Sequence, residues 1–465
     1  MGPNTLLGLI FGVLALALPR HRALGAVLAA GTCTTYGDAL DLGGLSFYSI
    51  RIVIVLTTVR VIARGELNGV RFHAFDALFA AWLIVTCLLY VTLDGSYVNL
   101  SERLGYMGDV GGLYIIVRAL VRNADDLAET VLMLALLLIP LAVLMGFERV
   151  IGRNLFSVLG GVPELSHVRN GMVRCQGPFN HPILAGTFGA ASFPLMVGLS
   201  VFRPRSRALA VVAALSAAFV VYTSGSSGPV SALIVSSIGL GMWWIRTQMR
   251  VVRWVILGGV IMFAMVMNAP VWFLISRLSD LTGGDGWYRS KLIDSAVYHF
   301  SEWWLIGTGY TAHWMETGIP SNPYSADIVN EFVNQGIRGG LLCLVLFVAI
   351  LSRSFAAMGT AANAVSTPLR QRYFFWTVGC SLAAHVASFF SVTYFDQTIS
   401  AYYLVIGSTV MAATVRNSRG RETPVRRPTG LAPPYLGWRR GEPPTTRMPV
   451  SNVPMNRSQR LRTMN

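Results

Sequence analysis

The chain has 465 residues, of which 53% are hydrophobic and 13% are charged, and its mean hydropathy is +0.54. Soluble domains carry roughly 25% charged residues, so this composition excludes an ordinary soluble globular protein and predicts that lipid surrounds most of the chain. The formal net charge of +15 would suggest nucleic acid binding in a soluble protein. Here much of that charge lies in one polar segment at the end of the sequence, and we expect no nucleic acid partner.

Long, largely apolar runs recur from the start of the chain and predict membrane-spanning helices. They lie at 6–18, 23–35, 47–59, 77–93, 111–117 with its flanks, 130–147, 182–202, 208–244, 254–275, 341–351, 374–395 and 398–415. The run 208–244 is too long for one crossing and is interrupted from Ser224 to Pro229, so we expect two helices there. The prediction is an all-α polytopic membrane protein, with twelve or thirteen transmembrane helices in residues 1–415.

Arginine clusters predict the orientation of these helices, because positive residues in short loops remain on the cytoplasmic side. The clusters fall in alternate loops, at 20–22, 60–71, 118–122, 203–207, 246–253 and 353–372. The loops 146–181 and 268–340 then face outward. The first apolar run is short, so the side of the N-terminus stays open: outside with thirteen crossings, inside with twelve.

Residues 416–465 differ from the rest of the chain. They hold eleven Arg against Glu422 and Glu442, together with eight Pro, and have almost no apolar periodicity. This composition predicts a disordered, basic, Pro-rich cytoplasmic tail. Two roles are open for it: attraction to the anionic lipids of the inner leaflet, or docking of a partner protein.

The outer loop 146–181 ends in a run of polar residues that leads directly into an apolar helix. His167, Arg169, Arg174 and His181 belong to this run, and Pro182 follows. A helix start offers free N–H donors, and Arg offers a planar fork of donors, so Arg174 and Arg169 suit a phosphate or carboxylate. The alternative is that both arginines lie at the level of the lipid headgroups.

The larger loop, 268–340, carries Arg289, His313 and most other candidates for chemistry. Asp327, Asn330, Glu331 and Asn334 recur at helical spacing, which predicts an amphipathic helix with a polar face. Two roles are open for this face: it binds a substrate, or it is exposed to solvent. Its tryptophans, Trp287, Trp303, Trp304 and Trp314, form either an interfacial belt or platforms for sugar rings. Five cysteines without paired spacing predict no disulfide and no metal site.

Three motifs occur in a fixed order in these loops. They are Arg174-x-x-Gly177-Pro-Phe-x-His181-Pro182-x-x-x-Gly186; Arg289 followed by Trp304-Leu-Ile-Gly307-x-Gly309; and Asp327-x-x-Asn330 leading to Gly336-Ile-x-Gly339-Gly340. With them, and with its topology over about residues 47–415, the chain resembles the O-antigen ligase and polymerase family. These are bacterial membrane proteins that join or extend glycans carried on undecaprenyl diphosphate.

The resemblance implies a GT-C-like glycosyltransferase of the bacterial inner membrane, with short helices in its large outer loop, an active site facing outside, and no cofactor or metal. In such proteins outer-loop arginines hold the donor diphosphate, a role that falls here to Arg174 and Arg289, with Arg169 beside them. The acceptor would contact Asn330, Glu331 and Trp304. The implied partners are the lipid-linked glycan, the bilayer, and the flippase and chain-length regulator of the same pathway.

The chain departs from the family pattern at the catalytic base. Many relatives have His-Asn where this chain has Ser325-Ala326. The remaining candidates, in order, are Asp327, His313 and His181. This departure favours a polysaccharide polymerase over a ligase. A transporter or flippase is the third hypothesis, which helix interiors almost free of charge disfavour.

Overall fold

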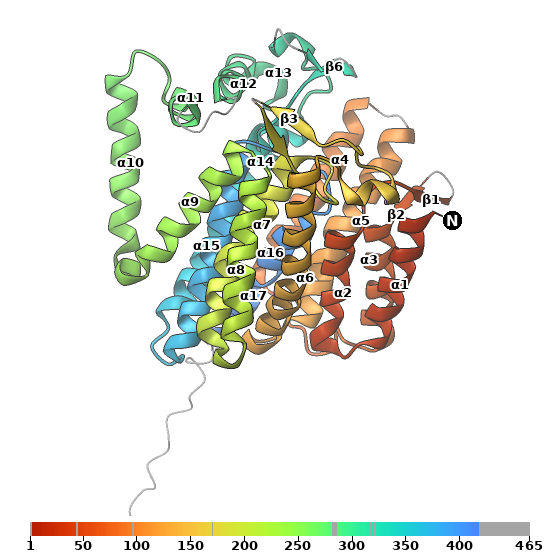
Figure 1. Ribbon diagram of the computed structural model, residues 1–465. Coiled ribbons are helices and arrows are strands. Elements are labelled where there is room, and N and C mark those ends of the chain that lie inside the picture. The colour runs from red at the N-terminus through yellow and green to blue at the C-terminus, as the bar shows by residue number, and fades with distance from the viewer. Residues whose placement is uncertain are drawn as a thin grey trace, which may run out of the picture. The chain divides into compact units, whose positions relative to one another are not determined.

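The computed structural model describes residues 2–42, 45–94, 97–169, 171–280, 286–315, 318–319 and 322–417. The described residues all belong to one compact unit of the chain. Nearly all of the predicted tail, from residue 418 onward, lies outside the described residues. The described part is mainly helical, as predicted, with three two-stranded antiparallel hairpins among its helices (Figure 1).

Every apolar run identified in the sequence is at least partly helical. The first ten helices are α1 (Pro3–Ala17), α2 (Arg20–Cys33), α3 (Ser49–Ala63), α4 (Ala74–Asp94), α5 (Tyr97–Leu120), α6 (Ala124–Ile151), α7 (Pro182–Phe202), α8 (Arg207–Thr223), α9 (Ser227–Gly241) and α10 (Met249–Val266). After the large loop come α14 (Glu331–Asn363), α15 (Leu369–Phe389), α16 (Ile399–Gly407) and α17 (Thr409–Asn417). The predicted split of 208–244 is confirmed, since α8 ends at Thr223 and α9 begins at Ser227.

Among the described residues, six helical stretches are long and apolar enough to cross a membrane. They are Ala74–Leu93, Ala124–Ile151, Pro182–Phe202, Pro204–Thr223, Ser227–Val266 and Glu331–Asn363. Ser227–Val266 contains α9, the short 3-10 helix η3 (Met242–Gln248) and α10. These stretches support a membrane protein, whereas the predicted count of twelve or thirteen crossings stays a prediction.

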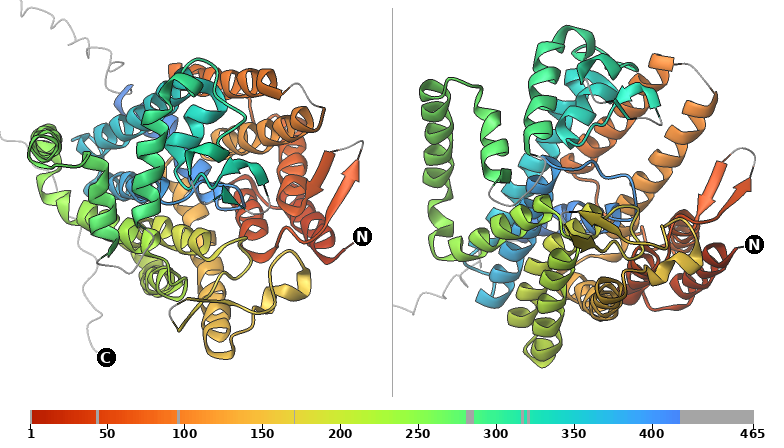
Figure 2. Two further views of the ribbon diagram at one scale, coloured as in Figure 1. Left: turned by 90° about the horizontal axis from the view of Figure 1, so that it is seen from above. Right: turned by 45° about the horizontal axis from the view of Figure 1, so that its top comes forward.

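Helix α7 lies among α6, α8, α9 and α15 and has the most buried surface of the long helices. Its glycines allow neighbours to approach closely, which is how membrane helices commonly pack. A Cβ at Gly198 would collide with Thr377, and one at Gly186 would collide with Ser224 in the α8–α9 turn. This packing holds the α8–α9 turn beside the start of α7. Helix α10 buries none of its residues and stands apart from the other helices in both figures (Figures 1 and 2).

The polar segments between helices form the hairpins and short helices. The first hairpin consists of β1 (Ala39–Leu42) and β2 (Leu45–Tyr48). The 3-10 helix η1 (Leu155–Leu159) follows α6, and after it comes the second hairpin, β3 (His167–Arg169) and β4 (Met172–Arg174), which pairs His167 with Arg174. A further 3-10 turn, η2 (Pro204–Ser206), precedes α8. The large loop contains η4 (Val271–Phe273), α11 (Leu274–Asp280), α12 (Gly286–Tyr298), α13 (Phe300–Trp303), η5 (Ala312–Trp314), β5 (Gly318–Ile319) and β6 (Asn322–Ala326). Figure 1 shows β3, α12, α13 and β6 at the same end of the helices.

The large loop is fixed to a kink in α14. Gly340 adopts a left-handed φ of 66°, and a side chain there would collide with the Leu305 carbonyl. Gly307 has a φ of 97°, and its missing side chain leaves room for the Ile337 carbonyl. Backbone hydrogen bonds from Thr308 N to Ile337 O (2.9 Å) and from Leu341 N to Trp304 O (2.8 Å) close this junction. The second and third sequence motifs therefore interlock.

The predicted amphipathic helix through Asp327 and Asn334 differs from the structure. The chain is extended up to Asn330, whose side chain accepts a hydrogen bond from Val333 N (3.1 Å) and caps α14, so the helix begins at Glu331. The polar residues Glu331 and Asn334 are buried rather than solvated. Asp327 and Asn330 therefore lie outside the helix, and spacing alone does not tell whether Glu331 and Asn334 meet solvent or protein.

Candidate functional site

A buried carboxylate anchors the segment that carries Arg174. Glu148 on α6 is 1% exposed and accepts hydrogen bonds from Ser166 Oγ (3.0 Å), Gln176 N (3.0 Å) and Gly177 N (2.9 Å). A second buried carboxylate, Asp396, accepts from Asn180 N (3.2 Å). Glu148 on α6 and Asp396 in the segment between α15 and α16 thus hold the chain between β4 and α7 in one conformation.

We expect Glu148→Ala to lower the melting temperature of the purified protein, because three donors lose their acceptor. A buried donor without an acceptor costs about 1–3 kcal/mol. Tryptophan fluorescence during heating in detergent measures the effect. Glu164→Ala, which removes an exposed carboxylate in the same loop, is the matched control and should change little. An unchanged melting temperature for Glu148→Ala would contradict this anchoring role.

Arg174 and Arg289 meet at the start of α9. Arg174 Nη2 donates to Ser226 Oγ (2.7 Å), and Arg289 Nη1, from α12, donates to Ser227 Oγ (3.3 Å). Ser226 is the residue before α9 and Ser227 is its first residue. A helix N-terminus carries a partial positive charge and free N–H groups. Two arginines, two hydroxyls and a helix start from three distant segments therefore surround one position.

Positive side chains gather around Arg174. Burial, and then the positive charge of nearby Arg169, lower the pKa of Arg174. Arg174 Nε is buried and has no hydrogen-bond partner among the described residues. A buried donor without a partner and two neighbouring cations both favour an anionic ligand. The association of Arg169, Arg174 and Arg289 with an anion stays a prediction, and the structure places Ser226 beside Arg174 and Ser227 beside Arg289.

His181 borders the same position, in the neutral form. Burial, and then the positive charge of Arg174 and of His167, lower the pKa of His181 to about 4. Its Nδ1 accepts a hydrogen bond from Ile183 N (3.2 Å) and caps α7. In a neutral imidazole the other nitrogen then carries the proton. His181 can therefore donate a hydrogen bond from Nε2, which suits an oxyanion better than the role of base.

Asp327 is connected to the helix that carries Arg289. Tyr288, the preceding residue on α12, donates from its hydroxyl to the Asp327 carbonyl oxygen (3.0 Å). Desolvation raises the pKa of the Asp327 carboxyl above its ordinary value, although the residue is exposed at its surface. A raised pKa makes a carboxylate a stronger base. Of the three candidates for the base, Asp327 combines an accessible carboxylate with proximity to Arg289's helix.

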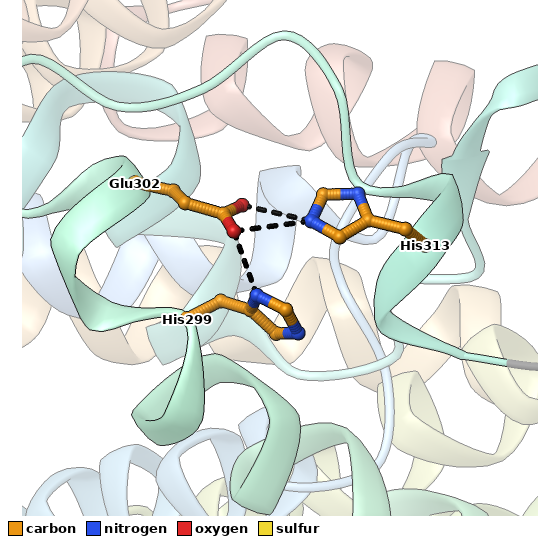
Figure 3. A group of neighbouring side chains, drawn as sticks. All are labelled: His299, Glu302 and His313. Atoms are coloured by element: carbon orange, nitrogen blue, oxygen red, sulfur yellow. Dashed lines mark hydrogen bonds and ion pairs between the residues drawn. The ribbon is translucent and has the colours of Figure 1, made fainter.

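His313, the second candidate for the base, belongs to a different group. Its Nε2 lies 3.0 Å from Glu302 Oε2, and His299 Nδ1 lies 2.7 Å from Glu302 Oε1 (Figure 3). His299 and Glu302 belong to the same polar loop, but the sequence assigns neither of them a role. The i,i+3 spacing of His299 and Glu302 was visible there, but His313 is eleven residues further on.

The three predicted acceptor residues do not share an exposed surface. Asn330 is 1% exposed and caps α14, while Trp304 is 46% exposed. Glu331 is buried and accepts hydrogen bonds from Gln335 Nε2 (2.7 Å) and Tyr394 N (3.3 Å). It lines a small internal cavity with Gln335 and aromatic residues that include Tyr106, Tyr394, Tyr402 and Tyr403. Trp304 alone is placed to meet a large ligand from outside.

No protein-family model matches the chain, and a search of curated proteins finds no match. The family resemblance therefore rests on the three motifs. What the structure contributes is their placement: Arg174 of the first motif meets Arg289 of the second at α9, and Gly307 of the second contacts Ile337 within the third. The class that these features define is a helical, membrane-type protein with a cationic site built from two loops.

Proposed function

We propose that the chain is a membrane glycosyltransferase that polymerises lipid-linked oligosaccharide repeat units into a surface polysaccharide, an exopolysaccharide or O-antigen. The observation that carries this proposal is the convergence of Arg174 and Arg289 on Ser226 and Ser227 at the start of α9. The donor is a glycan on undecaprenyl diphosphate, and its diphosphate is the anion that this position fits. The site faces outside the bacterial inner membrane.

The reaction follows from the charges. A hydroxyl of the acceptor repeat unit attacks the anomeric carbon of the donor glycan, and the bond from that carbon to the diphosphate oxygen breaks. Negative charge grows on the leaving diphosphate, where Arg174 and Arg289 stabilise it. The proton of the attacking hydroxyl passes to a base. The products are a longer lipid-linked glycan and free undecaprenyl diphosphate.

Asp327 is the base in this proposal, with His313 next and His181 last. The acceptor glycan lies over Trp304, whose exposed ring offers a platform for sugar C–H faces. Asn330 and Glu331 act from beneath, by fixing the start of α14. The flippase and the chain-length regulator of the same pathway are the proposed protein partners.

Two alternative functions are each compatible with a specific feature of the structure. A ligase that moves the finished glycan to a lipid or protein acceptor requires the same donor site. A flippase or transporter draws support from ionisable groups buried among the helices, such as Glu331, His385 and Asp396, since such groups often mark transport routes.

Deletion of the gene, with analysis of surface and lipid-linked glycans, tests the proposal. Single repeat units, on the lipid carrier or attached to the acceptor, mean that a polymerase was lost, which is the result we expect. Polymer stranded on the lipid carrier would identify a ligase. Glycan trapped inside the cell would identify a flippase and overturn the proposal. Complementation with the intact gene is the control.

A further inference from the structure

His299, Glu302 and His313 form a compact group in the large loop, outside the cationic site. His299 follows α12, Glu302 lies on α13, and His313 lies on the 3-10 turn η5. Figure 3 shows a nitrogen of each imidazole ring facing the Glu302 carboxylate. It lies 2.7 Å from His299 Nδ1 and 3.0 Å from His313 Nε2, and one ligand atom from each residue lies within 4.8 Å of the others.

We propose that these three side chains bind a Zn²⁺ ion. Two imidazoles and one carboxylate are ligands that Zn²⁺ takes, in sites that keep a further position open. Zn–N and Zn–O bonds of about 2.0–2.2 Å place tetrahedral ligand atoms about 3.3–3.6 Å apart. The two printed contacts, 2.7 and 3.0 Å, are somewhat shorter than this, so small rotations that open them bring the side chains to this geometry.

Glu302 is suited to the role because it is ionised. Desolvation opposes ionisation, but hydrogen bonds from Trp314, His313 and His299 outweigh it and lower the pKa of Glu302 to about 2. A carboxylate ligand must be deprotonated to bind a metal. Glu302 meets that requirement across the physiological range. Hard cations such as Mg²⁺ and Ca²⁺ prefer sites made of oxygen ligands alone, so the two imidazoles select against them.

Neighbouring side chains already hold the three ligands in place. Trp314 Nε1 donates to Glu302 Oε2 (3.1 Å), and the Trp314 ring stacks on His299 with the planes 6° apart. Tyr310 stacks on His313 at 15°. Trp314 itself is 4% exposed and packs in the core of the loop. Such outer partners orient metal ligands and are part of a metal site.

The bound ion would join α13 to η5 across the segment that contains Gly307. Glu302 and His313 are partly exposed, so the remaining coordination position faces solvent and takes water. The ion would stabilise the loop whether or not the proposed glycosyl transfer takes place, and its binding is measured without any glycan.

The test uses the full-length protein, purified in detergent, stripped with EDTA and titrated with ZnCl₂ in a calorimeter. We expect one Zn²⁺ per chain and a higher melting temperature with Zn²⁺. Glu302→Gln keeps the shape and accepts hydrogen bonds but lacks the charge. It should weaken binding by more than the roughly 10–100-fold loss expected for an outer partner. MgCl₂ should neither bind nor raise the melting temperature.

His167→Ala is the matched control, because His167 and His181 form the other close histidine pair among the described residues, with ring centres 6.3 Å apart. It should bind Zn²⁺ as the wild type does. If the metal-free Glu302→Gln variant has a lower melting temperature than the metal-free wild type, the test uses His313→Gln instead. Wild-type affinity in both loop variants, loss of binding in His167→Ala alone, or no binding by the wild type would each overturn the proposal.

Discussion

Arg174→Ala and Arg289→Ala should each abolish high-molecular-weight polysaccharide and leave single repeat units on the lipid carrier. Each change removes a cation from the position where the leaving diphosphate gains charge. Loss of one such stabilising donor typically costs about 10²–10³ in rate. Gel analysis of surface polysaccharide, with extraction of the lipid-linked pool, measures both products in a deletion strain that carries each variant.

Arg153→Ala is the matched control for this experiment. Arg153 belongs to the same outer loop and pairs with Glu164, but both side chains are more than 60% exposed, and such pairs contribute little. The control should produce normal polymer. Normal polymer from both Arg174→Ala and Arg289→Ala, at normal protein levels, would show that the donor site does not lie at the start of α9.

Asp327→Asn should reduce the rate of polymerisation by about 10²–10⁴, the usual contribution of a general base. The amide keeps the size of the side chain but does not accept the proton of the attacking hydroxyl. The assay is glycan extension by the purified protein on a lipid-linked repeat unit. Asp294→Asn is the control, since Asp294 pairs with Lys291 at the surface of the same loop.

The pH dependence of that assay gives a second measurement. The base must be ionised, so activity falls as the pH decreases through the pKa of Asp327. Desolvation raises this pKa, so the loss begins at a higher pH than an ordinary aspartate would give. The residual activity of Asp327→Asn should lack this limb. Full activity of Asp327→Asn would exclude Asp327 as the base.

Local patterns in the sequence predicted most of the helices. Pro182 and the preceding His181 mark the start of α7, and the Ser224–Pro229 interruption separates α8 from α9. These signals act within one or two turns of the chain, where sequence reasoning is strongest. The prediction that 327–334 form one helix was wrong at its start, because the Asn330 cap sets the boundary and helical periodicity does not reveal a cap.

The sequence could identify the arginines of the site but not their meeting point. Ser226 and Ser227 are 52 and 62 residues from the arginines they bind, and they looked like no more than a break between helices. The same limit applies to Glu331, whose polar face turned inward toward Tyr394. Contacts across such separations depend on helix packing, which short-range patterns in a single sequence do not reveal.

The interlock between Gly307 and the α14 kink has a consequence for biosynthesis. A chain grows from its N-terminus, and early segments fold first. The loop with Arg174 can therefore settle against Glu148 while the rest is still being made. The junction that closes the loop with Arg289 onto α14 forms only after residues 337–341 have been made. The two arginine-bearing loops are therefore completed at different stages of synthesis.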